Sequence, residues 1–219
     1  MFRKELLILG AISSLLFLVV AGGASLAVRA LQADAAMVAE DTLPGLVSAG
    51  EAIDQINRNW LNSHQLLHVS DAGQRAQIMR RIETNSTGPL WEAYSQSIRD
   101  PEDAQLFADV GRTRLEFLTL RTNYFALIQA QQTEEAARFF EDQLSPAFER
   151  YRRAASEAFR FNARMGKNRA ENILHYAGWT PYVMGGLAVA ILLAGVVIGF
   201  KASLGAFMPA QEDELLKQP

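Results

Sequence analysis

Residues 106–128 read LFADVGRTRLEFLTLRTNYFALI, and this stretch decides the fold. Its core-forming positions recur at alternating steps of four and three residues: Leu106, Val110, Thr113, Phe117, Leu120, Tyr124 and Leu127. Such steps place side chains on one face of an α-helix. A face sustained over the whole stretch is typical of helices that pack at about 20° to one another in a bundle. The sequence therefore predicts a bundle helix here.

The same spacing recurs on both sides of this stretch. Upstream, the positions are Leu46, Ile53, Trp60 and Leu67, with Ala49, Ile56 and Ser63 beside them. Downstream, they are Leu144, Phe148, Tyr151, Ala155, Ala158, Asn162 and Met165. Runs of β-branched residues are absent between these segments, so we expect almost no strand. The sequence predicts an all-α, up-down-up-down four-helix bundle whose bundle proper covers residues 44–167.

Capping residues and helix breakers set the expected helix boundaries. Asp100-Pro101 is a strong start signal, because Asp caps a helix and Pro suits the first helical position. We expect Thr133 to cap the fourth helix in the same way. The breakers lie at residues 44–45, 70–73, 87–89, 131–133 and 146. We expect the second helix to run to about Ile98 with a kink at residues 87–89, and the fourth to bend at Pro146.

Two uncharged runs flank the predicted bundle. No Asp, Glu, Lys or Arg occurs from Leu6 to Val28, which is 23 residues, or from Tyr176 to Phe200, which is 25. At 1.5 Å per residue, either run can cross a hydrocarbon core of roughly 30 Å. We predict transmembrane helices at residues 6–28 and 176–200, so the lipid bilayer is an expected partner. They separate an N-terminus at 1–5, a sensor domain at 29–175 and a tail at 201–219.

Two features of these runs leave alternatives open. A cleaved signal peptide ending at residues 25–27 is the other interpretation of the first run, but 23 residues exceed the usual h-region of about 7–15. Arg3 and Lys4 precede that run and only Arg29 follows closely, which places both termini in the cytoplasm and the bundle outside it. Four basic residues before the second run favour the opposite orientation: Arg160, Arg164, Lys167 and Arg169.

Gly195 and Gly199 form a GxxxG pattern in the second run. Small residues at this spacing let two transmembrane helices approach closely. The pattern predicts dimerisation through Gly195 and Gly199, and the alternative is chance, since small residues are common in such helices.

Composition excludes several classes of function. The formal net charge is −3 with both signs interspersed, so we expect no nucleic-acid partner. The absence of cysteine excludes disulfides, thiolate metal sites and thiol catalysis. The sequence has no Gly-rich phosphate loop, no nucleophile elbow and no Glu-x-x-His pair. We therefore expect neither an enzyme nor a bound cofactor.

The order of these features resembles a known family. It comprises an uncharged run, a Leu-Pro-Gly-Leu element at residues 43–46, four helices of similar length, Pro146 inside the fourth and a second run. This order, over about residues 2–200, resembles the four-helix-bundle sensor domain of methyl-accepting chemotaxis receptors. The resemblance implies a multi-pass receptor of the bacterial inner membrane that works as a homodimer. It also implies that a small ligand binds outside and that the last helix carries the signal through the second span.

The resemblance stops at residue 200. Members of that family continue into a HAMP linker and a signalling hairpin or kinase, whereas residues 201–219 follow here. We therefore expect signalling through a chemoreceptor or kinase partner in the membrane, or a truncated relative whose output is lost. The alternative function is a structural or scaffolding membrane protein with a helical-bundle assembly surface and no ligand. A ligand-sized cavity lined by arginines or polar groups would favour the sensor, and a filled core would favour the scaffold.

Five residues are candidates for contacts with a ligand or a metal ion, or for fixing the bundle. His64 and His68 stand four apart, a spacing that suits a metal ion, with Asp71 one turn on. The other interpretation is a flank and a surface histidine, with His64 also a candidate ligand contact. Arg58 is a candidate carboxylate ligand because arginine binds carboxylates in a bidentate way. Asn162 either fixes the register of the bundle or lies where water reaches a loosened core.

Overall fold

The computed structural model describes residues 2–207, and no strand occurs among them. The helices in chain order are α1 (Phe2–Met37), α2 (Leu43–Gln65), α3 (Ala72–Thr84), α4 (Gly88–Ser97), α5 (Pro101–Gln129), α6 (Thr133–Phe139) and α7 (Ser145–Phe207). Two π-helical turns, η1 (Val38–Thr42) and η2 (Phe140–Leu144), precede α2 and α7. The chain divides into a compact unit at Ala35–Ala170 and a second unit made of the two chain ends. Residues 208–219 of the expected tail lie outside the described residues.

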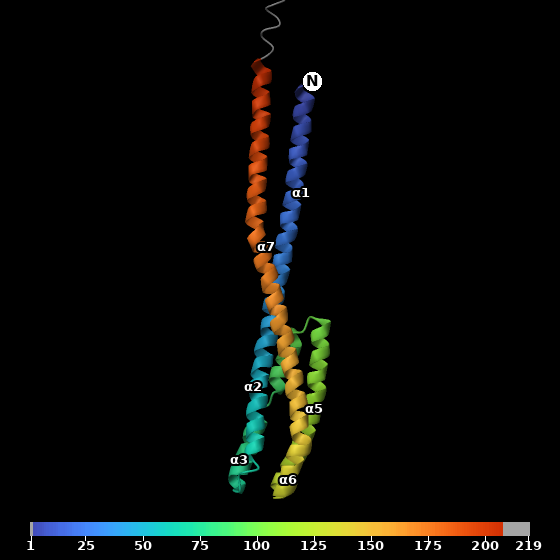
Figure 1. The fold of residues 1–219 in the computed structure, drawn as a ribbon, viewed down its shortest axis with the longest axis vertical. Coiled ribbons are helices and arrows are strands. Elements are labelled where there is room, and N and C mark those ends of the chain that lie inside the picture. The colour runs from blue at the N-terminus through green and yellow to red at the C-terminus, as the bar shows by residue number, and fades with distance from the viewer. Residues whose placement is uncertain (1, 208–219) are drawn as a thin grey trace, which may run out of the picture. The chain divides into compact units, whose positions relative to one another are not determined.

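The unit at Ala35–Ala170 is the predicted four-helix bundle. Figure 1 shows α2 running one way, α3 and α4 returning, α5 running out again, and α6 with the first part of α7 coming back. The all-α, up-down-up-down fold is confirmed. Most of the predicted seam is fully buried, including Ile56, Val110, Phe117, Tyr124, Phe148, Tyr151 and Ala155. Trp60 is half buried and packs against this core, stacked on Phe148 at a ring-centroid distance of 4.1 Å and on Phe140 at 4.5 Å.

The helix boundaries follow the capping signals with two corrections. Asp100 caps α5 as predicted, because its carboxylate accepts a hydrogen bond from the Glu102 backbone N–H at 2.8 Å. Thr133 is not a cap, since α6 begins at that residue and Gln132 precedes it without a side-chain bond. The expected kink at residues 87–89 is a full break between α3 and α4. Pro89 enters α4 in its first turn, where a residue without an N–H is tolerated.

Pro44 lies where the chain enters the bundle and Pro146 lies inside the fourth helical segment, and each follows a π-helical turn. Proline lacks an N–H, and its ring collides with the carbonyl four residues earlier. Pro44 and Pro146 each follow a π turn that contains that earlier residue, Glu40 in η1 and Asp142 in η2. A π turn widens the helix and removes the collision without ending it. The local bend expected at Pro146 therefore takes this form, and Pro44 leaves the chain helical.

Asn162 lies in a buried polar cluster in the core. Its side chain is 1% exposed, and its Nδ2 donates to the Tyr94 hydroxyl at 2.7 Å. The Tyr94 hydroxyl in turn donates to Asp103 Oδ1 at 2.5 Å. Gly45 of α2 makes room for this amide, because a Cβ there would lie 2.9 Å from Asn162 Oδ1. The interpretation in which water reaches a loosened core at Asn162 is therefore wrong.

The second unit contains the two uncharged runs. In the described residues, α1 and α7 each carry an apolar stretch long enough to cross a membrane, and no residue of either stretch is buried. A Cβ added at Gly195 or Gly199 would meet nothing within 4 Å in the described chain. These features agree in length and composition with the two predicted spans, and dimerisation through the glycines stays a prediction.

Candidate functional site

A partly enclosed cavity of about 70 Å³ lies inside the bundle unit. Its apolar walls include Ile56 of α2, Ile82 of α3 and Phe117 of α5. Its polar lining comes from the same helices, from the turn after α3 and from α7: Asn59, Glu83, Ser86, Thr87, Arg114, Arg121 and Tyr151. A water molecule needs about 10–15 Å³ on this measure, so the cavity has room for about five waters or a small ligand.

Arg114 and Arg121 bring positive charge to the cavity. They are seven residues apart on α5 and therefore share one face of the helix. Arg114 Nε donates to Thr87 Oγ1 at 3.4 Å, and the Arg121 guanidinium carbon lies 5.9 and 5.7 Å from the ring centroids of Phe117 and Phe125. Among the described side chains, neither arginine forms an ion pair with a carboxylate.

The environment of Arg121 disfavours its charge. Burial lowers the pKa of the Arg121 guanidinium, and the neighbouring Arg114 lowers it further, while Glu83 acts in the opposite direction. A guanidinium nevertheless stays protonated in proteins at neutral pH. The cavity therefore holds a half-buried cation, and in the described part of the chain no carboxylate contacts it to offset the cost of burial.

Asn59 supplies an acceptor without a donor. Its side chain is 4% exposed, and its Nδ2 donates to the Asn85 carbonyl at 2.8 Å. This bond fixes which end of the amide is nitrogen. Within the described part of the chain, the remaining atom, Oδ1, is buried and has no hydrogen-bond partner. An unsatisfied buried acceptor costs about 1–3 kcal/mol, so a donor from a ligand or water would be favourable there.

Tyr151 belongs to α7 and lines the cavity. Its hydroxyl accepts a hydrogen bond from Trp91 Nε1 at 2.7 Å and shares another with Thr87 Oγ1 at 3.1 Å. Burial raises the pKa of Tyr151, so the phenol is neutral at physiological pH. Because Thr87 also accepts from Arg114, one set of hydrogen bonds joins α4, α5 and α7 around the cavity.

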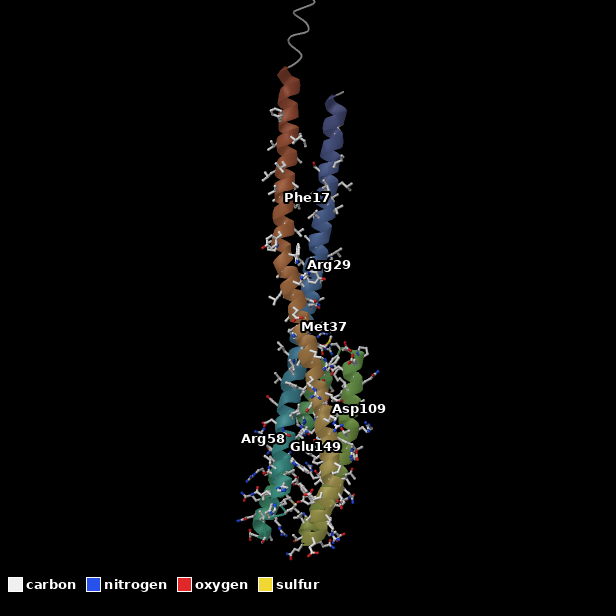
Figure 2. All side chains as sticks on the ribbon, viewed as in Figure 1. Phe17, Arg29, Met37, Arg58, Asp109 and Glu149 are labelled. Atoms are coloured by element: carbon white, nitrogen blue, oxygen red, sulfur yellow. The ribbon has the colours of Figure 1, made fainter. Side chains whose placement is uncertain are left out.

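Arg58 lies outside this cavity. It stands on the outer face of α2, where its guanidinium forms an exposed ion pair with Asp54 at 2.7 Å (Figure 2). The pair sits at i, i+4 and is more than half exposed on both sides. Ligand binding by Arg58 therefore stays a prediction without support from the cavity.

His64 and His68 do come together, with ring centroids 5.1 Å apart. Both are exposed, and His64 also packs edge-on against Phe140 at 5.5 Å. Asp71, the third candidate, caps α3 through a hydrogen bond from the Gln74 backbone N–H. No group of three or more His, Asp or Glu side chains suited to a metal occurs among the described residues. A two-histidine metal site stays a prediction.

Sequence reasoning missed Arg114, Arg121 and Asn59. The signal for the arginines was their spacing of seven, which keeps both beside the core positions Thr113, Phe117 and Leu120. For Asn59 the signal was its place three residues after Ile56, which is the spacing of one helical face.

Comparison with known proteins identifies the family. The family model described as a four helix bundle sensory module for signal transduction matches residues 3–176. No curated protein and no solved structure gives a significant match. The matched region contains the whole bundle unit and covers well over half of the chain. The chain therefore belongs to the family of four helix bundle sensory modules for signal transduction.

Proposed function

We propose that the protein is a membrane-anchored, chemoreceptor-like sensor. Its bundle lies outside the cytoplasm of a bacterial cell, binds a small ligand and signals through a chemoreceptor or kinase partner in the inner membrane. The family, a sensory module for signal transduction, supports this role. Two helices with stretches apolar enough to cross a membrane support the anchoring. Both termini are then cytoplasmic, and the protein works as a homodimer.

The observation that carries the proposal is the continuity of α7. This helix begins at Ser145, contributes Phe148 and Tyr151 to the bundle core, and ends at Phe207 beyond the second uncharged run. Residues on one helix move together when the helix shifts along its axis or tilts. A ligand that displaces Tyr151 would therefore act on the helix that also carries the second uncharged run.

The cavity favours a sensor over a scaffold. A bundle that serves only as an assembly surface needs a filled core, because voids and unpaired polar groups lower its stability. This bundle instead keeps a cavity lined by two arginines and by Asn59, whose Oδ1 has no hydrogen-bond partner among the described residues. A ligand that fills the cavity and pairs with its polar groups offsets this loss of stability.

A screen with the full chain tests the sensor function. The protein is reconstituted in lipid nanodiscs and its thermal unfolding is followed with a broad library of small metabolites. Because the chain has no cysteine, an Ala202→Cys variant carries a single thiol just after the second run. We expect compounds that raise the melting temperature also to change the rate at which a maleimide labels this thiol.

The control is Asn123→Cys on α5, a helix that ends inside the bundle. We expect the same compounds to leave its labelling rate nearly unchanged. If no compound in the library raises the melting temperature, the result contradicts ligand binding. Compounds that stabilise the bundle but leave the rate at residue 202 unchanged would contradict transmission along α7.

Labelling in cells tests the orientation. A membrane-impermeant maleimide should label Gln132→Cys, in the turn between α5 and α6, from outside the inner membrane. It should label Ala202→Cys only after permeabilisation. The reverse pattern would contradict the proposed topology.

A further inference from the structure

We propose that the cavity in the bundle binds a small carboxylate that also carries a hydroxyl or ammonium group. Arg114 and Arg121 hold the carboxylate, and Asn59 Oδ1 accepts a hydrogen bond from the hydroxyl or ammonium donor. This inference rests on the proposed sensor function and names the class of ligand and its site within one protomer. It differs from the sites at Arg58 and His64 expected from the sequence.

The charges of the cavity select an anion. Two guanidinium groups line it against one carboxylate, that of Glu83, which gives a formal excess of one positive charge. Arginine presents several N–H donors in a plane, which suits the two oxygens of a carboxylate. Because Glu83 is present at the same cavity, a second negative charge on the ligand is disfavoured. A monoanion or a zwitterion fits this balance better than a dianion.

The unpaired acceptor selects a donor on the ligand. Asn59 Nδ2 is already engaged by the Asn85 carbonyl, so the part of this buried amide that is left for a ligand is Oδ1. A carboxylate alone offers only acceptors and would leave that oxygen unpaired. A hydroxyl or ammonium group on the neighbouring carbon satisfies it. Sites built to hydrogen-bond a polar group reject analogues that lack the group.

The volume limits the size of the ligand. About 70 Å³ corresponds to about five water molecules, which matches the five or so non-hydrogen atoms of glycolate or glycine. Lactate and alanine are one carbon larger. Aromatic acids and long-chain acids exceed this space.

The site has a direct connection to the helix that enters the membrane. Tyr151 of α7 lines the cavity and shares a hydrogen bond with Thr87, which also accepts from Arg114. A carboxylate that draws the Arg114 guanidinium toward itself changes this set of bonds. The ligand therefore acts on α7 through Tyr151 without contacting the apolar runs.

Binding to the full chain in nanodiscs tests the proposal by calorimetry and thermal shift. The probes are glycolate, lactate, glycine and alanine, with acetate as the analogue without a donor and succinate as the dianion. We expect at least one of the first four to bind about tenfold or more tightly than acetate and succinate. A comparison of the affinities for glycolate and glycine distinguishes a hydroxyl donor from an ammonium donor. Sulfate and chloride are included as simple anions.

Two substitutions locate the site. Arg114→Gln and Arg121→Gln should each weaken binding of the best probe by about tenfold or more, because each removes a charged donor. Arg112→Gln is the matched control, since Arg112 is on the same helix but is exposed and paired with Asp109. It should leave the affinity unchanged. Where a variant fails to fold, the comparison of glycolate with acetate on the natural protein still decides the question.

Several results would overturn the inference. Equal affinities of the natural protein and both arginine variants would place the ligand elsewhere. If acetate, sulfate or chloride binds as tightly as the best of the four probes, Asn59 does not select a ligand that carries a hydrogen-bond donor. If none of the four probes binds but another compound from the library screen does, the result would refute the ligand class and leave the sensor function standing. If no compound binds at all, both the ligand class and the sensor function would be refuted.

Discussion

Asp41 Oδ2 and Arg169 Nη1 lie 3.1 Å apart in a buried ion pair, although 128 residues separate them in the chain. The two side chains are 4% and 9% exposed. Arg169 Nη1 also donates to Thr42 Oγ1 at 2.6 Å. Asp41 and Thr42 belong to η1 and Arg169 to α7, so this contact fastens the place where the chain enters the bundle to the place where it leaves.

Removing one partner of this pair should destabilise the bundle strongly. Arg169→Ala leaves the Asp41 carboxylate buried without a counter-charge, and such changes cost about 3–5 kcal/mol. The measurement is the free energy of unfolding of the full chain in detergent, from denaturant titrations followed by helical circular dichroism. The double variant Asp41→Leu with Arg169→Met should recover most of the loss, because it buries no charge.

The matched control is Arg152→Ala. Arg152 also lies on α7 and pairs with Glu149 at 2.7 Å, but both side chains are nearly half exposed. Exposed pairs contribute about 1 kcal/mol or less. A loss at Arg169 no larger than the loss at Arg152 would show that the buried pair does not fasten the bundle.

Gly45→Ala should destabilise the protein, whereas Gly111→Ala should stabilise it. A Cβ at Gly45 would lie 2.9 Å from Asn162 Oδ1, an amide held by Tyr94, and overpacking of this kind costs about 1–3 kcal/mol. A Cβ at Gly111 would meet nothing within 4 Å, so alanine there gains about 0.5–1 kcal/mol of helix propensity. Melting temperatures of the two variants in one detergent give the sign. A stabilising Gly45→Ala would refute the close approach.

The positions that sequence reasoning placed well are those where burial is set by local periodicity. Val110, Phe117, Tyr124 and Tyr151 are buried, and each lies at a position that recurs at alternating steps of four and three residues along its helix. On α2 the expected positions spaced by seven, such as Trp60, are only half buried. The other expected positions, Ala49, Ile56 and Ser63, are buried, and so are Ala52 and Asn59, which were not expected. This helix packs against α4 and α7 together, so its buried face is wider than one seam.

What sequence reasoning missed depends on contacts between helices. Whether Arg114 faces solvent or a cavity is decided by the rotation of α5 against α3 and α7, which its own spacing does not fix. The π turns before Pro44 and Pro146 were missed for a related reason. A proline in a helix is relieved by a kink, a break or a wider turn, and the packing of the flanking helices selects among them.

The pH dependence of stability should report on Asp103. Burial raises the pKa of Asp103 above its usual value of 3.8, and hydrogen bonds from Tyr94 and Asn162 oppose the change. A carboxyl whose pKa is raised on folding stabilises the folded state fully below the unfolded pKa. That contribution is lost as the pH rises through the folded pKa. The stability of the natural protein relative to Asp103→Asn should therefore fall as the pH rises from about 3.5 toward neutrality.

Denaturant midpoints of both proteins across that pH range provide the measurement. Only the difference between the two proteins is used, because the other carboxyl groups titrate in both. A difference that stays constant, or that grows in favour of the natural protein as the pH rises, would contradict the proposed effect of burial on Asp103.

The proposed homodimer predicts a cross-link in the second uncharged run. Leu192→Cys carries the only thiol of the chain and lies one turn before Gly195, so oxidation in native membranes should give a disulfide-linked dimer on non-reducing gels. Adding Gly195→Leu and Gly199→Leu should abolish it, because large side chains prevent the close approach that small residues allow. Adding Gly186→Leu instead should leave it intact, since residue 186 lies about 180° around the helix from residue 195. Equal loss of the cross-link in both backgrounds, or its persistence in both, would mean that the GxxxG pattern does not form the interface.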